Sequence, residues 1–286
     1  MRARIRDTEL HFDVDGPGLA WGEHGMVERP VLFLVHGGPG GDHVSFKRSS
    51  AALRDVAQLV YIDQRGCGRS ARGPRSSYNL ENNIDDLDAL RDHLGLERIS
   101  LLGSSYGGMV ALGYALRYPQ RLANLILVCT APSYRFLEDA RRFVETHGTP
   151  EQRRVCQPLW EGRFESLEQL REFYEVMGPL YARRFRPEEF AANWERSSRN
   201  VDALNEGFGG FLRNFDYTPR LHEITCPTLI LAAAHDWICP PQHSRLMAER
   251  IPRAHLKLFA HSGHMLPHDE NEAYLAAVRG FLTYAA

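Results

Sequence analysis

The sequence lacks a strong excess of charge of either sign, and it lacks long apolar runs. Its 34 basic and 36 acidic residues give a formal net charge of −2, so there is no overall field to attract nucleic acid or an anionic membrane. No apolar stretch approaches the roughly 18 residues that a membrane-spanning helix needs. Residues 1–10 alternate in charge without the apolar centre of a signal peptide. We therefore expect a cytoplasmic protein without nucleic-acid or membrane partners.

Lysine and paired cysteine are also scarce. Only Lys47 and Lys257 are lysines, so 34 − 2 = 32 of the basic residues are arginines. These arginines are interspersed with acids, which favours surface ion pairs over a phosphate-binding patch. The five cysteines are odd in number and include no C-x-x-C pair, so neither a disulfide framework nor a zinc site is indicated. We expect no metal and no cofactor, and the sequence does not fix an oligomeric state.

Short apolar runs separated by helix-like segments dominate the rest of the 286-residue chain. Such runs are typical of strands buried on both faces of a sheet. Strands that alternate with helices predict an α/β fold with a mostly parallel, doubly wound sheet. The expected strands are Val31–Val35, Leu59–Ile62, Ile99–Leu102, Leu125–Val128, Thr228–Ala232 and Leu256–Phe259, and the clearest helices are Leu80–Leu94 and Tyr106–Arg117.

Two regions depart from this alternation. Residues 4–22 are predicted to form an antiparallel edge hairpin that turns around Asp15-Gly16-Pro17-Gly18. Residues 133–219 contain no convincing strand, but Ser166 and Pro187 each mark the start of a helix. We therefore expect three segments: residues 1–132 as the first part of an α/β core, 133–219 as a helical cap, and 220–286 as the second part of the core.

The segment Gly103-Ser104-Ser105-Tyr106-Gly107 matches G-x-S-x-G. It lies directly after an expected strand and before an expected helix, as in a nucleophile elbow, where the glycines make room for a strained turn that exposes the serine hydroxyl. Ser105 is the candidate nucleophile, because only it has glycine two residues before and two after. A glycine-rich turn without any reaction is the competing interpretation.

A glycine-rich loop, His36 to Gly41, follows the first parallel strand. Glycine lets backbone N–H groups approach a ligand closely, as an oxyanion hole requires. We assign the two donors to the backbone N–H groups of Gly38 and Tyr106, the latter at the start of its helix. A phosphate-binding loop is the alternative, although neither a Walker ending nor G-x-G-x-x-G is present.

A serine nucleophile needs a base, and the base needs an acid to orient it. His264 follows the last expected strand and is the preferred base, with His261 and His268 as rivals. Asp236 follows the preceding strand, at the carboxyl end where open α/β sheets build their sites. The chain order Ser105, Asp236, His264 is the order of an α/β-hydrolase.

Three motifs together resemble those of the proline iminopeptidase (prolyl aminopeptidase) family of α/β-hydrolases. They are His36-Gly37-Gly38-Pro39-Gly40, the segment from Asp63 to Ser70, and Gly103-Ser104-Ser105-Tyr106-Gly107-Gly108. The resemblance implies the α/β-hydrolase fold and a cofactor-free serine exopeptidase whose helical cap covers the active site. Its substrates would be small peptides or other small acyl compounds.

The resemblance also implies acidic residues that hold the free amino group of the substrate. Glu206 is the candidate in the cap segment. Some relatives carry a glutamate directly after the catalytic aspartate, where this chain has Trp237, which would offer an apolar or cation-π wall. Asp63 and Arg65 are interpreted as structural, and Cys67 as lying near the pocket without a reactive thiol.

The predicted function is hydrolysis through an acyl-enzyme, with release of an N-terminal proline or similar residue from small peptides or amino-acid amides. An esterase, lactonase or amidase that does not require a free amine is the first alternative. A ligand-binding protein that keeps the fold without turnover is the second.

Overall fold

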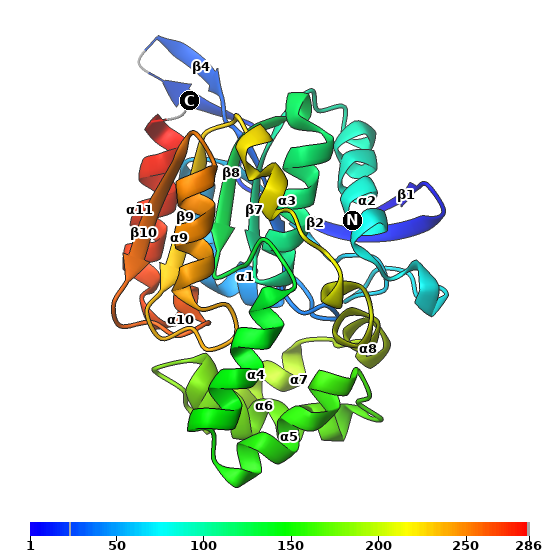
Figure 1. Ribbon diagram of the computed structural model, residues 1–286. Coiled ribbons are helices and arrows are strands. Elements are labelled where there is room, and N and C mark those ends of the chain that lie inside the picture. Colours follow the sequence, from blue (N-terminus) through cyan, green and yellow to red (C-terminus); the bar gives the residue numbers. More distant parts are fainter. Residues whose placement is uncertain (23, 285–286) are drawn as a thin grey trace.

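The computed structural model describes residues 1–22 and 24–284, and its centre is an eight-stranded sheet (Figure 1). The strand order is β1-β2-β6-β5-β7-β8-β9-β10, with antiparallel pairing at β1/β2 and β2/β6 and parallel pairing elsewhere. The strands are β1 (Arg2–Ile5), β2 (Thr8–Asp15), β5 (Val31–Val35), β6 (Gln58–Ile62), β7 (Ile99–Ser104), β8 (Leu122–Val128), β9 (Thr228–Ala233) and β10 (Ala254–Phe259). The six predicted parallel strands and the predicted fold class are confirmed.

Helices cover both faces of this sheet, because alternate side chains of each buried strand point to opposite faces. In β5, Phe33 and Val35 pack into one core, and Leu32 and Leu34 into the other. The core helices are α1 (Val44–Ser50), α2 (Leu80–His93), α3 (Tyr106–Arg117), α9 (Pro241–Arg250), α10 (Leu266–Asp269) and α11 (Asn271–Tyr284). None of the helices in the described ranges is long and apolar enough to cross a bilayer.

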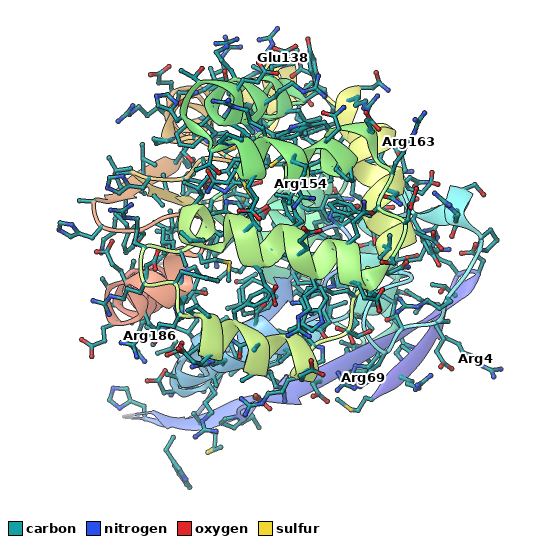
Figure 2. All side chains as sticks on the ribbon, turned by 90° about the horizontal axis from the view of Figure 1, so that it is seen from below. Arg4, Arg69, Glu138, Arg154, Arg163 and Arg186 are labelled. Atoms are coloured by element: carbon teal, nitrogen blue, oxygen red, sulfur yellow. The ribbon has the colours of Figure 1, made fainter. Side chains whose placement is uncertain are left out.

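Five helices occupy the chain between β8 and β9, and we call them the inserted helices. They are α4 (Arg135–His147), α5 (Pro150–Glu161), α6 (Leu167–Tyr181), α7 (Pro187–Arg196) and α8 (Val201–Gly209). The predicted helix starts are correct, since the Ser166 side chain caps α6 by accepting from the Gln169 N–H, and Pro187 is the first residue of α7. Figures 1 and 2 show the inserted helices, coloured from green to olive-yellow, across one end of the sheet.

The predicted N-terminal hairpin is wrong in its turn. The edge hairpin is β1 with β2, and it turns at Arg6 and Asp7 rather than at residues 15–18. Arg6 adopts a left-handed φ of 47°, and its guanidinium binds Asp86 and Asn82 on α2, which holds the tight turn against the core. Gly16 also has a positive φ of 89°, but there the chain leaves the main sheet. It continues into the separate pair β3 (Leu19–Gly22) and β4 (Gly25–Glu28).

The loop from Asp63 to Ser70 is held by buried charges. The Asp63 carboxylate accepts hydrogen bonds from the backbone N–H of His43 and of Arg69 and contacts His43 Nδ1 at 2.7 Å. Burial is the largest single effect and opposes ionisation of Asp63. The hydrogen bonds from His43 and the Arg69 N–H and the nearby His36 together outweigh it, so the pKa of Asp63 lies well below its ordinary value. Burial raises the pKa of the Cys67 thiol to about 12, which leaves that thiol protonated and unreactive.

Arg65 anchors the same loop to α2. Its guanidinium donates to both carboxylate oxygens of Asp86 at 2.7 and 2.8 Å, and both side chains are almost completely buried. A buried pair of this kind is costly to break, because the remaining charge is left without compensation.

We expect Arg65→Met to lower the free energy of unfolding by about 3 kcal/mol, since Asp86 stays buried with only Arg6 as a partner. Arg69→Met is the matched control, because the Arg69 side chain is exposed, and it should change stability by less than about 0.5 kcal/mol. Urea unfolding curves measure both. Equal destabilisation by the two variants would contradict the role given to Arg65.

Candidate active site

Ser105 occupies a strained turn between β7 and α3. Its φ of 55° and ψ of −123° lie outside the regions that residues with a side chain usually adopt. Hydrogen bonds on both sides impose this conformation: the Ser105 N–H donates to the Val128 carbonyl at 2.9 Å, and the Ser105 carbonyl accepts from Thr130 Oγ1 at 2.7 Å. The turn puts Ser105 immediately before the first residue of α3.

The glycines of G-x-S-x-G are required by close contacts between backbones. A Cβ atom on Gly103 would lie 2.2 Å from the Gly107 carbonyl oxygen, and one on Gly107 would lie 2.0 Å from the Val35 carbonyl oxygen. No side chain fits at either distance. The glycines of the motif therefore let the start of α3 pack against the end of β5, and this packing fixes the position of Ser105.

His264 and Asp236 are in direct contact although 28 residues separate them in the chain. His264 Nδ1 and Asp236 Oδ2 are 2.8 Å apart, and both side chains are buried. The other oxygen of Asp236 accepts from the backbone N–H groups of Ile238 and Cys239 at 3.0 and 2.9 Å, which fixes the carboxylate. A carboxylate on Nδ1 favours the tautomer whose Nε2 accepts a proton.

The glycine-rich loop lies against Ser105. A Cβ atom on Gly37 would lie 3.1 Å from Ser105 Cβ, so the backbone of the loop closely approaches the serine. Gly38 has a φ of 127°, a value that favours glycine. Tyr106 is the first residue of α3, so its N–H has no acceptor within the helix.

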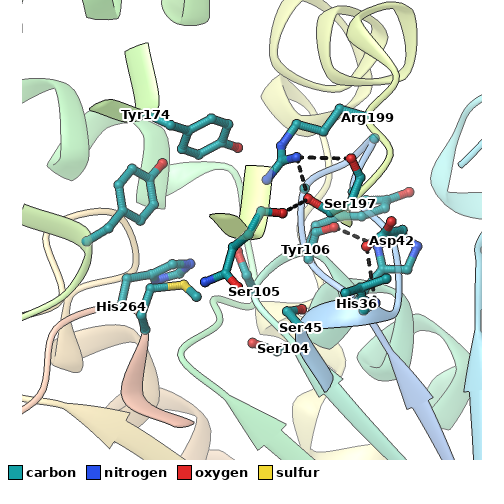
Figure 3. Close-up of a pocket in the computed structure, with 18 of the residues that line it drawn as sticks. His36, Asp42, Ser45, Ser104, Ser105, Tyr106, Tyr174, Ser197, Arg199 and His264 are labelled. Atoms are coloured by element: carbon teal, nitrogen blue, oxygen red, sulfur yellow. Dashed lines mark hydrogen bonds between the residues drawn. The ribbon is translucent and has the colours of Figure 1, made fainter. Parts of the chain in front are cut away.

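One cavity of about 820 Å³ brings most of these residues together. Ser105, His264, Gly38 and Tyr106 all line it, and Figure 3 shows Ser105 and His264 facing the same space. The remaining walls come from α1, from the segment around α10, from the inserted helices and from the loop between α6 and α7. The aromatic side chains on these walls are Phe136, Tyr174, Tyr181, Phe190 and Phe208 of the inserted helices and Phe185 of that loop. A cavity with one candidate nucleophile and an apolar wall suits a small acyl substrate.

The structure does not bring Glu206 into this cavity, which corrects its expected role as an anchor for an amine. Leu204 and Phe208 of α8 line the cavity, and residue 206 lies two positions from each, on the opposite face of the helix. The Glu206 carboxylate instead accepts from Arg75 Nε at 2.9 Å at the surface. The resemblance pointed to an acid in the cap segment but could not give the helix face that it occupies.

Trp237 is also not part of the cavity wall. It is 1% exposed and packs edge-on against Tyr181, with ring centroids 5.2 Å apart. Tyr181 lines the cavity instead and lies edge-on to His264 at 5.6 Å. The indole therefore supports the wall from behind.

Sequence reasoning missed the residues that attach the inserted helices to the histidine loop. Asp269 is buried, and its carboxylate accepts from the backbone N–H groups of Gly263, Arg183 and Arg184 at 2.8 to 3.0 Å. The Tyr181 carbonyl accepts from the Met265 N–H at 2.8 Å. These bonds join the end of α6 to both sides of His264, and no short motif signals them.

The side chains of His11, His43 and Asp63 form the one group in the described ranges whose arrangement could hold a metal ion. These residues do not line the cavity. Both oxygens of Asp63 already accept hydrogen bonds from the chain, so the cluster is explained as a buried network beneath the glycine-rich loop.

Comparison with known proteins identifies the family. Residues 30–271 match the model of the alpha/beta hydrolase fold. The chain is 31% identical to the proline iminopeptidase PfmaB of Pestalotiopsis fici over 94% of this chain and 98% of that protein. The structure of a proline iminopeptidase from Mycobacterium smegmatis superposes with a TM-score of 0.78 at 24% identity. The match covers 100% of this chain and 98% of the iminopeptidase. A thermophilic esterase from Thermogutta terrifontis gives a TM-score of 0.77 at 28% identity, and the match covers 100% of this chain and 99% of the esterase.

We expect Gly107→Ala to lower the free energy of unfolding by about 2–3 kcal/mol, because the new Cβ meets backbone that cannot move aside. Gly280→Ala is the matched control in α11, where no atom lies within 4 Å of an added Cβ, and it should be neutral or stabilising by up to about 1 kcal/mol. Urea unfolding measures the stabilities. A Gly107→Ala variant as stable as Gly280→Ala would refute the contact with Val35.

Proposed function

Because this chain belongs to the proline iminopeptidase family of α/β-hydrolases, we propose that it is a serine hydrolase that removes an N-terminal proline or similar residue from small peptides or amino-acid amides. The observation that carries this proposal is the strained turn at Ser105, which opens onto the same cavity as a histidine held by a buried aspartate. Such a turn is stable only when the surrounding structure enforces it.

In this reaction Ser105 Oγ attacks the substrate carbonyl carbon while His264 Nε2 takes the hydroxyl proton. The backbone N–H groups of Gly38 and Tyr106 bind the oxyanion, each contributing on the order of 3 kcal/mol to the transition state. When the tetrahedral intermediate collapses, His264 gives its proton to the leaving amine and an acyl-enzyme remains. Water then attacks the acyl carbon, His264 takes a proton from that water, and collapse releases the acid and returns the proton to Ser105.

Residues 133–219 act as the cap in this proposal. Phe136, Tyr174 and Phe208 of the inserted helices form part of the cavity wall, and the bonds through Asp269 and Tyr181 fasten the end of α6 to the histidine loop. An attached cap limits access to small molecules and peptide ends, since a folded protein chain cannot enter.

The amino group of the substrate then needs a carboxylate other than Glu206. The acids on the cavity lining are Asp42 and Glu189. Glu189 lies 3.6 Å from Arg186 and 3.8 Å from Arg48. Asp42 is buried, and among the described residues it accepts only from the backbone N–H groups of Val44 and Ser198. Asp42 is therefore the better partner for an ammonium group.

An esterase or amidase that does not need a free amine is the second candidate. Two observations favour it: Glu206 lies outside the cavity, and a buried indole occupies position 237. The esterase from Thermogutta terrifontis has the same overall fold. The two candidates share the nucleophile and differ only in whether an amine is recognised.

We expect Ser105→Ala to lower kcat by at least roughly 10³-fold, because no other group can form the acyl-enzyme. Asp236→Asn should lower kcat by about 10³- to 10⁴-fold, because His264 loses the tautomer that accepts a proton. A chromogenic proline arylamide measures both, and Ser104→Ala is the control that should retain turnover. Labelling by a fluorophosphonate reagent checks the nucleophile independently. Undiminished labelling of Ser105→Ala would refute the assignment.

We expect N-acetylation of proline β-naphthylamide to lower kcat/KM by more than roughly 10-fold, since acetylation removes the charge that a carboxylate would bind. Glu206→Gln should leave kcat/KM for the free amine unchanged within about twofold, because its partner Arg75 lies at the surface. Equal rates on the free and acetylated substrates would remove the amine from recognition and favour the esterase or amidase.

A further inference from the structure

Arg199 extends into the cavity from the short segment between α7 and α8. Its side chain is half-buried and forms part of the same wall as Ser105 and His264. Figure 3 shows its guanidinium directed into the space between Tyr174 and Ser197. The reaction described above does not use this side chain.

Contacts with Ser197, Trp194 and Tyr174 hold the guanidinium in place. Nη1 donates to Ser197 Oγ at 2.5 Å, and the guanidinium carbon lies 4.0 Å from the ring centre of Trp194. The other nitrogens of the guanidinium make no hydrogen bond to any residue in the described ranges. The group is therefore held in one orientation while part of its donor fork faces the cavity.

Arg199 forms no salt bridge with any residue in the described ranges. No carboxylate in the described part of the chain lies within 4 Å of its guanidinium, Asp42 included, whereas Lys47, Arg48 and Arg186 on the same lining are all paired with acids. Burial lowers the pKa of Arg199 and outweighs the opposing effects of Tyr174 and Asp42, so the cavity wall disfavours this cation. Five cationic side chains but only two acids line the cavity, the cations being Lys47, Arg48, Arg186, Arg196 and Arg199.

The segment that carries Arg199 is tied to the glycine-rich loop. The Asn200 N–H donates to the Gly40 carbonyl at 2.8 Å, and the Ser198 N–H donates to Asp42 Oδ2 at 2.6 Å. The residues on both sides of Arg199 are thus bonded to the loop that presents Gly38. The guanidinium keeps a fixed position relative to the oxyanion site, as a specificity residue must.

We propose that Arg199 binds a carboxylate of the substrate within the cavity that holds Ser105. The substrates of this site are accordingly acids: a dipeptide with a free carboxyl terminus, or an ester or amide with a carboxylate elsewhere in the molecule. This inference rests on the proposed function in needing Ser105 as the nucleophile, but it does not need a free amine. A planar guanidinium with free N–H groups matches a carboxylate in shape and charge.

Two substrate pairs test the proposal by comparing an acid with a neutral analogue. The peptide pair is Pro-Ala and Pro-Ala amide, and the ester pair is 4-nitrophenyl hydrogen adipate and 4-nitrophenyl hexanoate. We expect the wild-type protein to favour the acid of at least one pair by about 10- to 100-fold in kcat/KM, the range of a charge-assisted hydrogen bond. Arg199→Gln should reduce that preference to about twofold or less while its rate on the neutral analogue changes less than about threefold.

Arg196→Gln is the matched control, because Arg196 carries the same charge on the same lining but its side chain is exposed. It should retain most of the preference. If both variants lose the preference for the acid equally, the preference comes from the overall positive charge of the cavity, which would overturn the assignment to Arg199. If Arg199→Gln lowers kcat/KM equally on acids and on neutral analogues, Arg199 only supports the cavity wall, and the proposal is overturned as well.

The wild-type protein alone decides the question if Arg199→Gln does not fold, since equal rates on acid and neutral analogue in both pairs contradict the proposal. Failure of the proposed function looks different. In that case Ser105→Ala retains the wild-type rates, or no substrate of either pair is turned over, and binding of Pro-Ala and its amide by calorimetry then tests Arg199 directly. Equal affinities would overturn the inference.

Discussion

The contact between the first turn of α3 and the carbonyl oxygen of Val35 is the constraint on which the candidate site depends. With only 2.0 Å between that oxygen and an added Cβ at Gly107, the helix can approach β5 only if residue 107 has no side chain. The approach leaves no room for an ordinary strand-to-helix connection, so Ser105 takes a positive φ. The same closeness puts the glycine-rich loop after β5 beside Ser105, so the backbone of that loop approaches the proposed nucleophile without any long side chain.

The second half of the site depends on hydrogen bonds between the core and the inserted helices. Asp269 joins the histidine loop to the end of α6, and Asp42 joins the glycine-rich loop to the segment after α7. Each carboxylate is buried and satisfied by backbone N–H groups, so the connections are directional as well as strong. The inserted helices are therefore held to the site at two places, which suits a wall that fixes substrate position better than a freely moving lid.

The fold, the elbow and the relation of Asp236 to His264 could be predicted from the sequence because each depends on local patterns. Strand ends follow apolar runs, the turn at Ser105 follows glycine spacing, and strand ends of a parallel sheet share one edge. Glu206, Trp237 and the N-terminal turn could not be predicted in the same way. The face of α8, the layer behind Tyr181 and the contact of Arg6 with α2 are all set by packing between distant segments, and no short window of sequence contains that information.

The charges of the cavity show the same difference between what local sequence patterns predict and what packing decides. In sequence, the arginines of the inserted segment alternate with acids and predict a surface of ion pairs. Five of the thirteen, Arg142, Arg154, Arg163, Arg171 and Arg186, form such pairs. Arg199 differs because Trp194 and Ser197 hold its side chain away from the acids on the surface. An unpaired cation inside a catalytic cavity carries a cost in stability unless a ligand supplies the missing charge. Its place on the wall of the cavity that Ser105 lines therefore favours a ligand, rather than the fold, as its partner.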